Sequence, residues 1–386
     1  MAMINYKKAP NKKRETAACG SVCLRAAAPP RETTLQPPPK YLSPSADIIK
    51  NTPLTGKKKV QIYDKFLTYR KKISPHGEIY VSLHLQRDAG SQPVHQKRYN
   101  NMDKEIKNID LTQWQQVGEG GNGKTYVNPS TPDVILKVNN SRLSTRQAVE
   151  REFNVSRAVK SLGISVPEAK EMVRVGNVYG TITQLIKPKQ SLGRICCDTP
   201  GRTEEMASLL CARGKELFAM PCDTATFPNR KQQLLQALNK VQFVDRKTLH
   251  SLEAFAQRIP DTTTCLHGDF QMGNLILSGE QHYWIDLDRF GYGDPMFDVG
   301  HLYMLCNVYS SMKYVQGLFH VTRDQFHRFW DAFARAYTGS ADHADFDREA
   351  ARFACFDVTL RYAYDKPNLP EKLFFSIFIH RLAKHF

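Results

Sequence analysis

The chain has 386 residues, of which 41% are hydrophobic, which is enough for a sizeable core. No run of about 18 apolar residues occurs, so we expect no membrane span. The nine cysteines are scattered and form no pair of C-x-x-C motifs, which indicates reduced thiols and a cytoplasmic protein.

The net charge of +16 is concentrated in residues 1–101, which hold 19 of the 54 lysines and arginines but only 6 of the 38 acidic residues. Ten of the 21 prolines also lie there, and we expect a largely disordered extension. Residues 60–85 are more structured in pattern, and 79–85 alternate like a short strand, which would not be stable alone. Two alternatives stay open: Met102 could be the true start of the domain, or the extension could bind nucleic acid or an anionic membrane.

A glycine-rich turn lies between two short strands that we expect at 114–117 and 125–127. Glycines allow backbone N–H groups to approach phosphates closely. The turn also matches the P-loop pattern G-x-x-x-x-G-K-[ST], but a P-loop must open a helix, and residues 126–129 indicate a strand and a turn. We therefore expect a nucleotide-binding hairpin whose glycines are Gly118, Gly120, Gly121 and Gly123.

The next apolar strand, residues 133–139, has Lys137 at its centre. A lysine at this place resembles the kinase lysine that binds the α- and β-phosphates. The following helix, about 145–161, should supply its carboxylate partner. Glu152 shares the inward stripe of this helix with Val155 and Val159, whereas Glu150 lies roughly opposite. The spacing therefore predicts a pair between Lys137 and Glu152.

Residues 265–298 read CLHGDFQMGNLILSGEQHYWIDLDRFGYGDPMFD and contain the candidate base and metal ligands. Two apolar runs, 275–277 and 283–287, predict a β-hairpin, with Asp286 on its second strand. Asp269 would accept the proton of an attacking hydroxyl, while Asn274 and Asp286 would hold Mg²⁺ against nucleotide phosphates. Three further residues are expected in supporting roles: His267 and Asp298 would brace the loop, and Asp288 could be a second metal or water ligand.

HGDFQMGN, together with IDLD followed by GDP, resembles the aminoglycoside phosphotransferase and choline kinase group, small-molecule relatives of protein kinases. Glu152 followed by LGISVP at 162–167 is similar to the E…LG-x-x-VP arrangement of that group. The resemblance implies a two-lobe, protein-kinase-like α+β fold, with a β-rich nucleotide lobe at 102–191 and a helical catalytic lobe at 192–386. It also implies ATP (or GTP) as donor, with backbone groups of Gln184 to Ile186 at the adenine edge.

Helical periodicity in the second lobe predicts helices at 204–219, 230–238, 246–258, 299–308, 323–337, 345–364 and 373–385. Within 323–337, an i, i+3, i+4, i+7 stripe of large aromatic residues favours core packing over a substrate platform. This stripe consists of Phe326, Phe329, Trp330 and Phe333.

The combined motifs predict an enzyme that transfers a γ-phosphate to a hydroxyl of a small molecule. Residues 287–293 are too short for a peptide platform, and no A-P-E motif follows. The acceptor should enter a pocket of the helices after residue 299, whose mixed charges disfavour polycationic aminoglycosides. Four charged residues are candidates there: Asp324, Asp331, Arg335 and Arg361. The alternatives are a nucleotide-binding pseudokinase or regulator, which the complete set of base and metal residues disfavours, and nucleic-acid binding through residues 1–101.

Overall fold

The computed structural model describes residues 106–120, 123–139, 145–365 and 367–386. The expectations for residues 1–101, including the strand at 79–85, lie outside these ranges, and so does Gly121. No helix within these ranges is both long and apolar enough to cross a bilayer.

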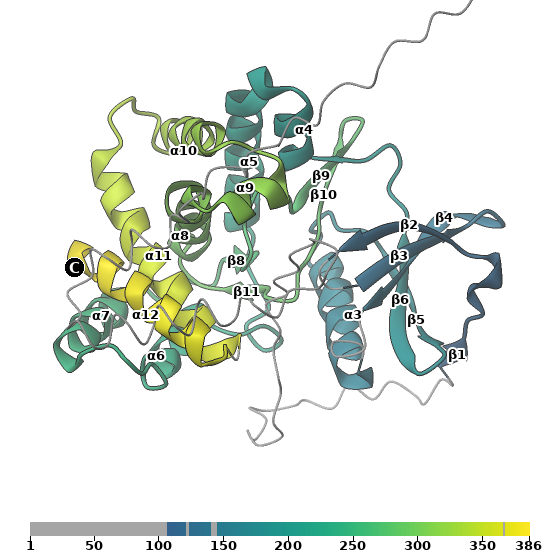
Figure 1. The fold of residues 1–386 in the computed structure, drawn as a ribbon, viewed down its shortest axis with the longest axis horizontal. Helices are drawn as coiled ribbons and strands as arrows, with labels where there is room; N and C mark the ends of the chain where they lie inside the picture. The colour runs from purple at the N-terminus through teal and green to yellow at the C-terminus, as the bar shows by residue number, and fades with distance from the viewer. Residues whose placement is uncertain (1–105, 121–122, 140–144, 366) are drawn as a thin grey trace, which may run out of the picture. The chain divides into compact units, whose positions relative to one another are not determined.

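The first described part is a six-stranded sheet with the strand order β1-β5-β6-β4-β3-β2 (Figure 1). Neighbouring strands are antiparallel except β1 and β5, which are parallel. A short 3-10 helix, η1 (Leu111–Gln113), connects β1 to β2. The strands are β1 (Lys107–Asn108), β2 (Gln115–Gly120), β3 (Gly123–Asn128), β4 (Thr131–Asn139), β5 (Ala169–Val175) and β6 (Val178–Gln184).

Helix α3 (Arg146–Ser161) follows β4 and packs against β5 and β6. Thr145 caps its start, because the side-chain oxygen accepts a hydrogen bond from the Ala148 N–H at 3.3 Å. Val149 and Val159 are buried, so the apolar stripe of the helix faces the interior as the sequence predicts.

Two small sheets follow in the chain: β7 (Gln190–Ser191) pairs with β9 (Leu275–Ser278), which pairs with β10 (Gln281–Trp284), and β8 (Cys265–Leu266) pairs with β11 (Gly291–Tyr292). The predicted hairpin is present, but its second strand ends at Trp284 instead of reaching residue 287. Asp286 has a φ of 57°, which no strand residue adopts, and both Trp284 and Leu287 are buried. The expected strand position of Asp286 is therefore wrong: this residue lies just beyond the strand.

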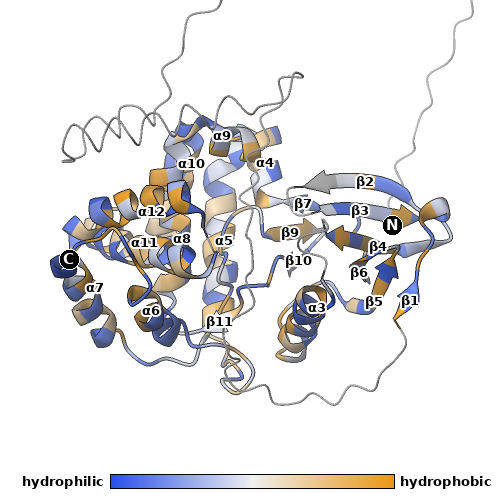
Figure 2. Ribbon diagram, turned by 60° about the horizontal axis from the view of Figure 1, so that its bottom comes forward, coloured by the Kyte–Doolittle hydropathy of each residue, from blue (hydrophilic) through white to orange (hydrophobic). Residues whose placement is uncertain are grey.

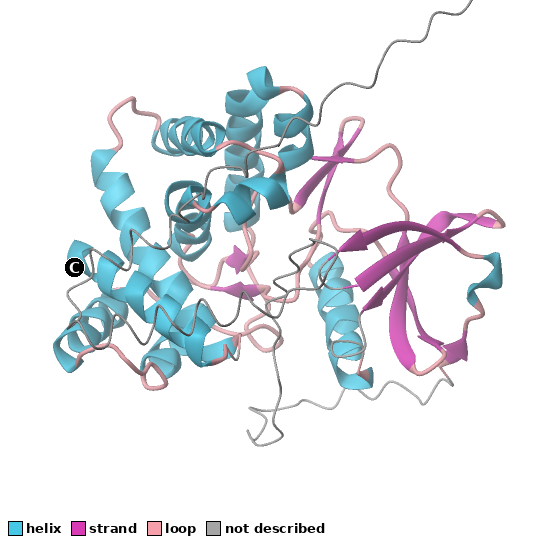
Figure 3. Cartoon of the chain, viewed as in Figure 1, coloured by secondary structure: helices cyan, strands magenta, loops and turns pink. Residues whose placement is uncertain are grey.

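The remaining part is mostly helical (Figure 3). Every predicted helix occurs, with ends shifted by a few residues, except that 299–308 is divided between α8 and a π-helix. The helices missed by sequence reasoning are α4 and α9, which are only seven residues each. The helices are α4 (Leu192–Asp198), α5 (Thr203–Phe218), α6 (Arg230–Leu238), α7 (Arg246–Arg258), α8 (Met296–Tyr303), the π-helix η3 (Met304–Val308), α9 (Lys313–Phe319), α10 (Arg323–Thr338), α11 (Ala344–Tyr364) and α12 (Leu369–Leu382), with short 3-10 turns η2 (Pro200–Arg202), η4 (Tyr309–Ser311) and η5 (Ala383–His385).

The core of the helical part forms where α11 packs against α8, and α10 against α5. The aromatic stripe of α10 is buried there, which agrees with its prediction as core. Figure 2 shows orange, apolar residues along β4 and β9 and on parts of α8, α11 and α12. The predicted α+β architecture, a β-rich part followed by a larger helical part, is confirmed.

Candidate active site

The loop after β8 is fixed by Asp298, which is buried on α8. Its two carboxylate oxygens accept hydrogen bonds from the N–H groups of His267 at 2.6 Å and Gly268 at 2.8 Å. The His267 ring accepts from the Asp269 N–H at Nδ1 (3.3 Å) and lies 3.0 Å from the Ile285 carbonyl at Nε2. Burial lowers the pKa of His267, so the ring is neutral with its proton on Nε2. Both residues thus contact the loop rather than open space.

Phe270, next to Asp269, anchors the loop in the core. Its ring is fully buried, with centroids 5.4 Å from Phe218 of α5, 5.6 Å from Trp284 of β10 and 6.0 Å from Phe333 of α10. A side chain at Gly214 of α5 would lie 2.7 Å from this ring. The close approach of α5 to Phe270 therefore requires glycine at 214, and the packing fixes the backbone that carries Asp269.

Asn274 joins Asp269 to the segment of Asp286. Its side-chain nitrogen donates to the Oδ2 atom of Asp269 and to the Asp269 carbonyl, each at 2.8 Å. The backbone carbonyl of Asn274 accepts a hydrogen bond from the Ile285 N–H at 3.0 Å. Because the nitrogen is used in these bonds, the amide oxygen of Asn274 is the atom left for a metal.

Asp286 and Asp288 supply further oxygen atoms. The Asp286 side chain is 54% exposed, and Asp288 is also reached by solvent. Desolvation by the surrounding protein, together with the charges of Asp269 and Asp286, raises the pKa of Asp288 even though Arg289 opposes this shift. Asp288 is therefore a partly desolvated carboxyl with the charges of Asp269 and Asp286 nearby, and a bound cation would favour its ionised form.

Lys137 connects β4 to both α3 and Asp286. Its Nζ atom lies 2.7 Å from Oε1 of Glu152 and 3.7 Å from Oδ1 of Asp286. Burial disfavours the charged lysine, but Glu152 and Asp286 outweigh it and raise the pKa of Lys137. Asn139 donates to the other oxygen of Glu152 at 3.3 Å. Glu150 is exposed on the same helix, so the structure pairs Lys137 with the glutamate that its helical position predicts.

The glycine-rich turn joins β2 to β3, with Gly120 paired to Gly123. A side chain at Gly118 would lie 2.7 Å from Oγ1 of Thr125, and one at Gly123 would lie 2.3 Å from the Val138 carbonyl. Gly123 therefore needs to be glycine for close strand packing, because backbone atoms block a side chain there, whereas at Gly118 the Thr125 side chain would have to move. Strand β3 follows the turn, which excludes the helix that a P-loop requires.

The strand end near residue 184 leaves few groups for an adenine edge. The N–H of Gln184 donates to the Glu168 carbonyl and that of Leu185 to the Asp133 carbonyl, each at 2.8 Å. The backbone donor for an adenine would therefore come from Ile186, whose side chain is buried.

Sequence reasoning missed His301 and Asp357, and it named Arg361 only as one of four charged candidates near the acceptor. The Oδ1 atom of Asp269 lies 3.1 Å from Nε2 of His301 on α8 and 3.3 Å from Nη2 of Arg361 on α11. Buried Asp357 contacts both, at 3.2 Å from Nδ1 of His301 and 3.0 Å from Nε of Arg361. The signal was present, because Asp357 and Arg361 are separated by one helical turn within an otherwise apolar stretch of α11.

This network sets the charge of Asp269. Burial disfavours its ionised form, but the hydrogen bond and charge of His301, with the charges of Arg361 and Arg289, hold the pKa of Asp269 well below its usual range. Arg289 also pairs with Asp365 at 2.7 Å. Asp269 is therefore a carboxylate at neutral pH, in contact with cationic groups.

Of the four charged residues that the sequence leaves open near the acceptor, Arg361 contacts Asp269. The other three lie on α10 and form ion pairs away from Asp269. Asp331 pairs with Arg335 and with His343, which precedes α11, and Asp324 pairs with Arg328. Their side chains are exposed on that helix, at 42%, 55% and 81% for Asp331, Arg335 and Asp324. Arg361 is thus the one of these four residues for which the described part of the structure shows a contact with Asp269.

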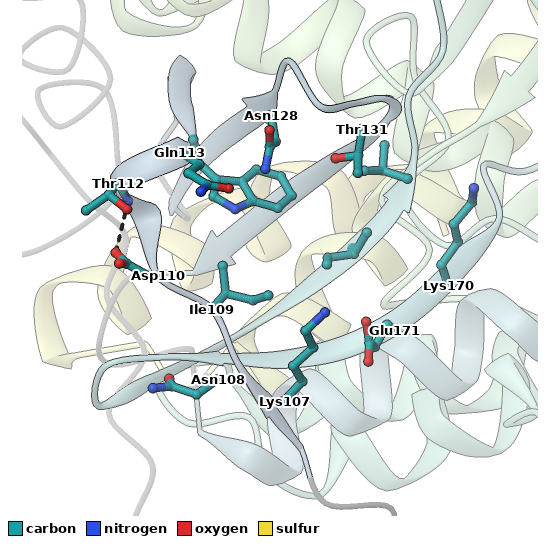
Figure 4. Close-up of a pocket in the computed structure, with 13 residues that line it drawn as sticks. Lys107, Asn108, Ile109, Asp110, Thr112, Gln113, Asn128, Thr131, Lys170 and Glu171 are labelled. Atoms are coloured by element: carbon teal, nitrogen blue, oxygen red, sulfur yellow. Dashed lines mark hydrogen bonds between the residues drawn. The ribbon is translucent and has the colours of Figure 1, made fainter.

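A separate hollow of about 530 Å³ lies against the sheet, lined by β1, η1 and parts of β3 to β6 (Figure 4). Val134 of β4 lines it, and the alternation of side chains places Val134 and Lys137 on opposite faces of the strand. The Asp110 carboxylate accepts from the Thr112 N–H at 3.0 Å at its edge. The hollow therefore belongs to the face of the sheet opposite to Lys137.

Comparison with known proteins gives distant relatives. Acyl-CoA dehydrogenase family member 10 of Mus musculus is 24% identical over 224 residues, which are 52% of this chain and 20% of that protein. The chain thus spans about one fifth of that relative. Among solved structures, a thermostable mutant of aminoglycoside phosphotransferase APH(4)-Ia has a TM-score of 0.48 and 14% identity, covering 70% of this chain and 94% of that one. A choline/ethanolamine kinase family protein from Mesorhizobium loti has a TM-score of 0.43 and 14% identity, covering 70% and 87%.

The sequence model of the phosphotransferase enzyme family matches residues 113–353, which extend from the end of η1 to the middle of α11. This range includes every described candidate site residue except Asp357, Arg361 and Asp365. The match confirms the resemblance that the motifs at 265–298 predict. The chain belongs to the phosphotransferase enzyme family.

Proposed function

We propose that this protein transfers the γ-phosphate of ATP or GTP to a hydroxyl of a small molecule. The observation that supports this most is that two pairs of side chains lie on joined segments. Asn274 donates to Asp269 at 2.8 Å, Lys137 lies 3.7 Å from Asp286, and the backbone bond from Ile285 to Asn274 joins the two segments. The remaining supports are the glycine-rich hairpin and Glu152. In this proposal, residues 102–191 form the nucleotide lobe and residues 192–386 the catalytic lobe.

The reaction assigns one task to each group. Asp269 orients the acceptor hydroxyl and takes its proton at Oδ1, while the acceptor oxygen forms a bond to the γ-phosphorus. The bond between that phosphorus and the bridging oxygen breaks, and its electron pair leaves with the nucleoside diphosphate. Lys137, held by Glu152, binds the phosphates of the donor and stabilises the charge that develops on them.

The oxygen atoms that these side chains offer fit Mg²⁺. Mg²⁺ prefers hard oxygen ligands and usually binds through one or two carboxylates together with substrate phosphates and water. The amide oxygen of Asn274 and the exposed carboxylate of Asp286 supply such atoms, and Asp288 offers a further one. Bound there, the ion would neutralise negative charge on the nucleotide phosphates.

The acceptor side of Asp269 favours a small molecule that is not a polycation. Arg361, Arg289 and the ring of His301 surround this carboxylate and are neutralised by Asp357 and Asp365. A kanamycin-like aminoglycoside is a polycation that favours a pocket of carboxylates, whereas Asp357 and Asp365 are already paired with these cations. The segment 287–293 contains β11 and connects directly to α8, so it offers little chain for binding a peptide.

The test is a transfer assay with the purified full-length protein, Mg²⁺ and γ-labelled ATP or GTP against a library of hydroxylated metabolites. We expect transfer to a small metabolite, no transfer to protein substrates, and weak or no transfer to kanamycin. Efficient phosphorylation of kanamycin would contradict the acceptor class and leave phosphotransfer intact. Nucleotide binding with no transfer to any acceptor or to water would instead favour a pseudokinase.

The seven described cysteines are free thiols, which agrees with the cytoplasmic location that we include in this proposal.

A further inference from the structure

His301 is a buried polar residue in the apolar first helix after the catalytic segment, α8. Its ring is fixed on both sides: Nε2 lies 3.1 Å from Oδ1 of Asp269, and Nδ1 lies 3.2 Å from Oδ1 of Asp357. Nδ1 also lies 3.0 Å from Nη2 of Arg361. Burying a polar group costs free energy unless it is hydrogen-bonded, and both ring nitrogens of His301 have polar partners.

The contact with Asp269 is a donated hydrogen bond in either charge state of the ring. A doubly protonated ring donates from Nε2 to Asp269 and from Nδ1 to Asp357. A neutral ring can accept from Arg361 at Nδ1 and then carries its only proton on Nε2. In both cases the protonated Nε2 atom lies 3.1 Å from Oδ1 of Asp269, within hydrogen-bond distance.

The two oxygens of Asp269 are therefore held from opposite sides. Asn274 donates to Oδ2 at 2.8 Å, and His301 donates to Oδ1 at 3.1 Å. Two hydrogen bonds to different oxygens fix the rotation of the carboxylate plane. That rotation decides where the second lone pair of Oδ1 points, which is where an acceptor hydroxyl would have to donate.

Arg361 is the looser partner of the same oxygen, at 3.3 Å. Its other contacts, to Asp357 at 3.0 Å and Asp365 at 3.8 Å, hold it whether or not it touches Asp269. An incoming hydroxyl can therefore replace the Arg361 contact while the His301 contact stays.

We propose that His301 is a positioning residue for phosphotransfer, which acts by holding the Asp269 carboxylate in the orientation that receives the acceptor hydroxyl. Asp357 acts behind it by fixing the ring. This inference rests on the proposed function, and it adds the helical part, through α8 and α11, to the machinery that orients the base.

The test compares two variants of similar size. In His301→Gln, the side-chain nitrogen reaches the place of Nε2 and can still donate to Asp269. In His301→Asn, the nitrogen reaches only the place of Nδ1, so the bond to Asp357 can persist while that to Asp269 is lost. The probe is Mg·ATP hydrolysis by the full-length protein, with water as the acceptor and phosphate release as the readout. Melting temperature and Mg·ATP affinity are measured on the same samples.

We expect His301→Asn to lower kcat by at least about tenfold, because small misplacements of a catalytic group cost on the order of 10²-fold. KM for Mg·ATP should stay unchanged, since Lys137 and Asp286 are untouched. His301→Gln should recover most of kcat. Wild-type kcat in His301→Asn would overturn the proposal, and so would an equal loss in both variants that follows their melting temperatures.

A second measurement separates this inference from the proposed function. The ¹⁵N signals of the wild-type His301 ring should show a protonated Nε2, and a proton on Nδ1 alone would overturn the inference whatever the activity. If Asp269→Asn hydrolyses Mg·ATP as fast as the wild type, the proposed function fails instead, while the ¹⁵N result still decides the contact.

Discussion

The Nζ atom of Lys137 lies 3.7 Å from Oδ1 of Asp286, which links strand β4 to the segment after the β9–β10 hairpin. A metal ion on Asp286 would compete with this contact. Glu152, at 2.7 Å, holds the lysine in place independently of the metal. Lys137 thus has one permanent partner, Glu152, and a second partner, Asp286, that a metal ion would take over.

The first prediction concerns Glu152→Gln, which removes the charge that fixes Lys137. We expect kcat/KM for Mg·ATP hydrolysis to fall on the order of 10- to 100-fold, because hydrogen bonds to charged groups are worth about 1.5–3 kcal/mol. Glu150→Gln on the exposed side of the same helix is the matched control and should leave the kinetics unchanged. Equal effects of the two changes would argue against the assigned pair.

The second prediction separates base from metal ligand. Asp269→Asn should keep Mg·ATP binding, measured by calorimetry, and lose about 10²–10⁴-fold in turnover, because general base catalysis contributes that much. Asp286→Ala should abolish Mg·ATP binding itself, since it removes the main anionic ligand of the ion. Normal turnover in Asp269→Asn, or unchanged Mg²⁺-dependent binding in Asp286→Ala, would mean that the roles are wrongly assigned.

The third prediction concerns Gly268, which has a φ of 80° in the catalytic loop. A side chain there would lie 2.0 Å from the Arg289 carbonyl and 2.1 Å from Nη2 of Arg230. Burial lowers the pKa of Arg230, and its guanidinium donates to that same carbonyl. Gly268→Ala must therefore displace packed groups as well as adopt a left-handed conformation.

We expect Gly268→Ala to lower the free energy of unfolding by on the order of 3–5 kcal/mol, the range of the most damaging substitutions. Gly279→Ala is the control, because Gly279 has a similar φ of 61° but nothing within 4 Å of the added carbon. It should cost only about 1–2 kcal/mol, the usual cost of left-handed backbone for alanine. Urea denaturation of the two variants decides this, and similar losses would show that crowding at Gly268 is unimportant.

The sequence predicts those parts of the fold that depend on local pattern. Helices α6 and α7 have the predicted ends, and Glu152 lies on the predicted side of α3, because side-chain periodicity determines which face of a long helix is buried. The position of Asp286 was missed, since the positive φ at this residue arises from the turn that buries Leu287 beside Trp284. No local pattern in a Tyr-Trp-Ile-Asp-Leu run reveals such a turn.

The contacts of Asp269 with His301 and Arg361 were missed for another reason. These residues are separated by 32 and 92 positions from Asp269, and only the packing of α8 against α11 brings them together. Sequence periodicity predicts that both helices are buried but not which polar side chains meet between them. The network around Asp269 is therefore a tertiary feature, although the motif that contains Asp269 is local.

The last prediction follows from the charge of His301. Burial disfavours the protonated ring, but Asp357 and Asp269 outweigh it and raise the pKa of His301 to about 9, compared with 6.5 for a free ring. Arg361, 3.0 Å from Nδ1, is the cationic group that faces the ring from α11. A group whose pKa is higher in the folded state stabilises that state in full below its unfolded pKa. The stabilisation is then lost as the pH rises from about 6.5 through about 9.

The measurement is the free energy of unfolding of wild type minus that of His301→Gln, from urea titrations between about pH 6 and 10. This difference should shrink by up to about 3 kcal/mol across the window, since one unit of pKa shift corresponds to about 1.4 kcal/mol. Asp357 stays ionised throughout, because Arg361 and His301 overcome its burial and hold the pKa of Asp357 below its usual range, so it adds no slope of its own. A difference that does not change with pH would mean that His301 is neutral in the folded protein, with Arg361 donating to Nδ1.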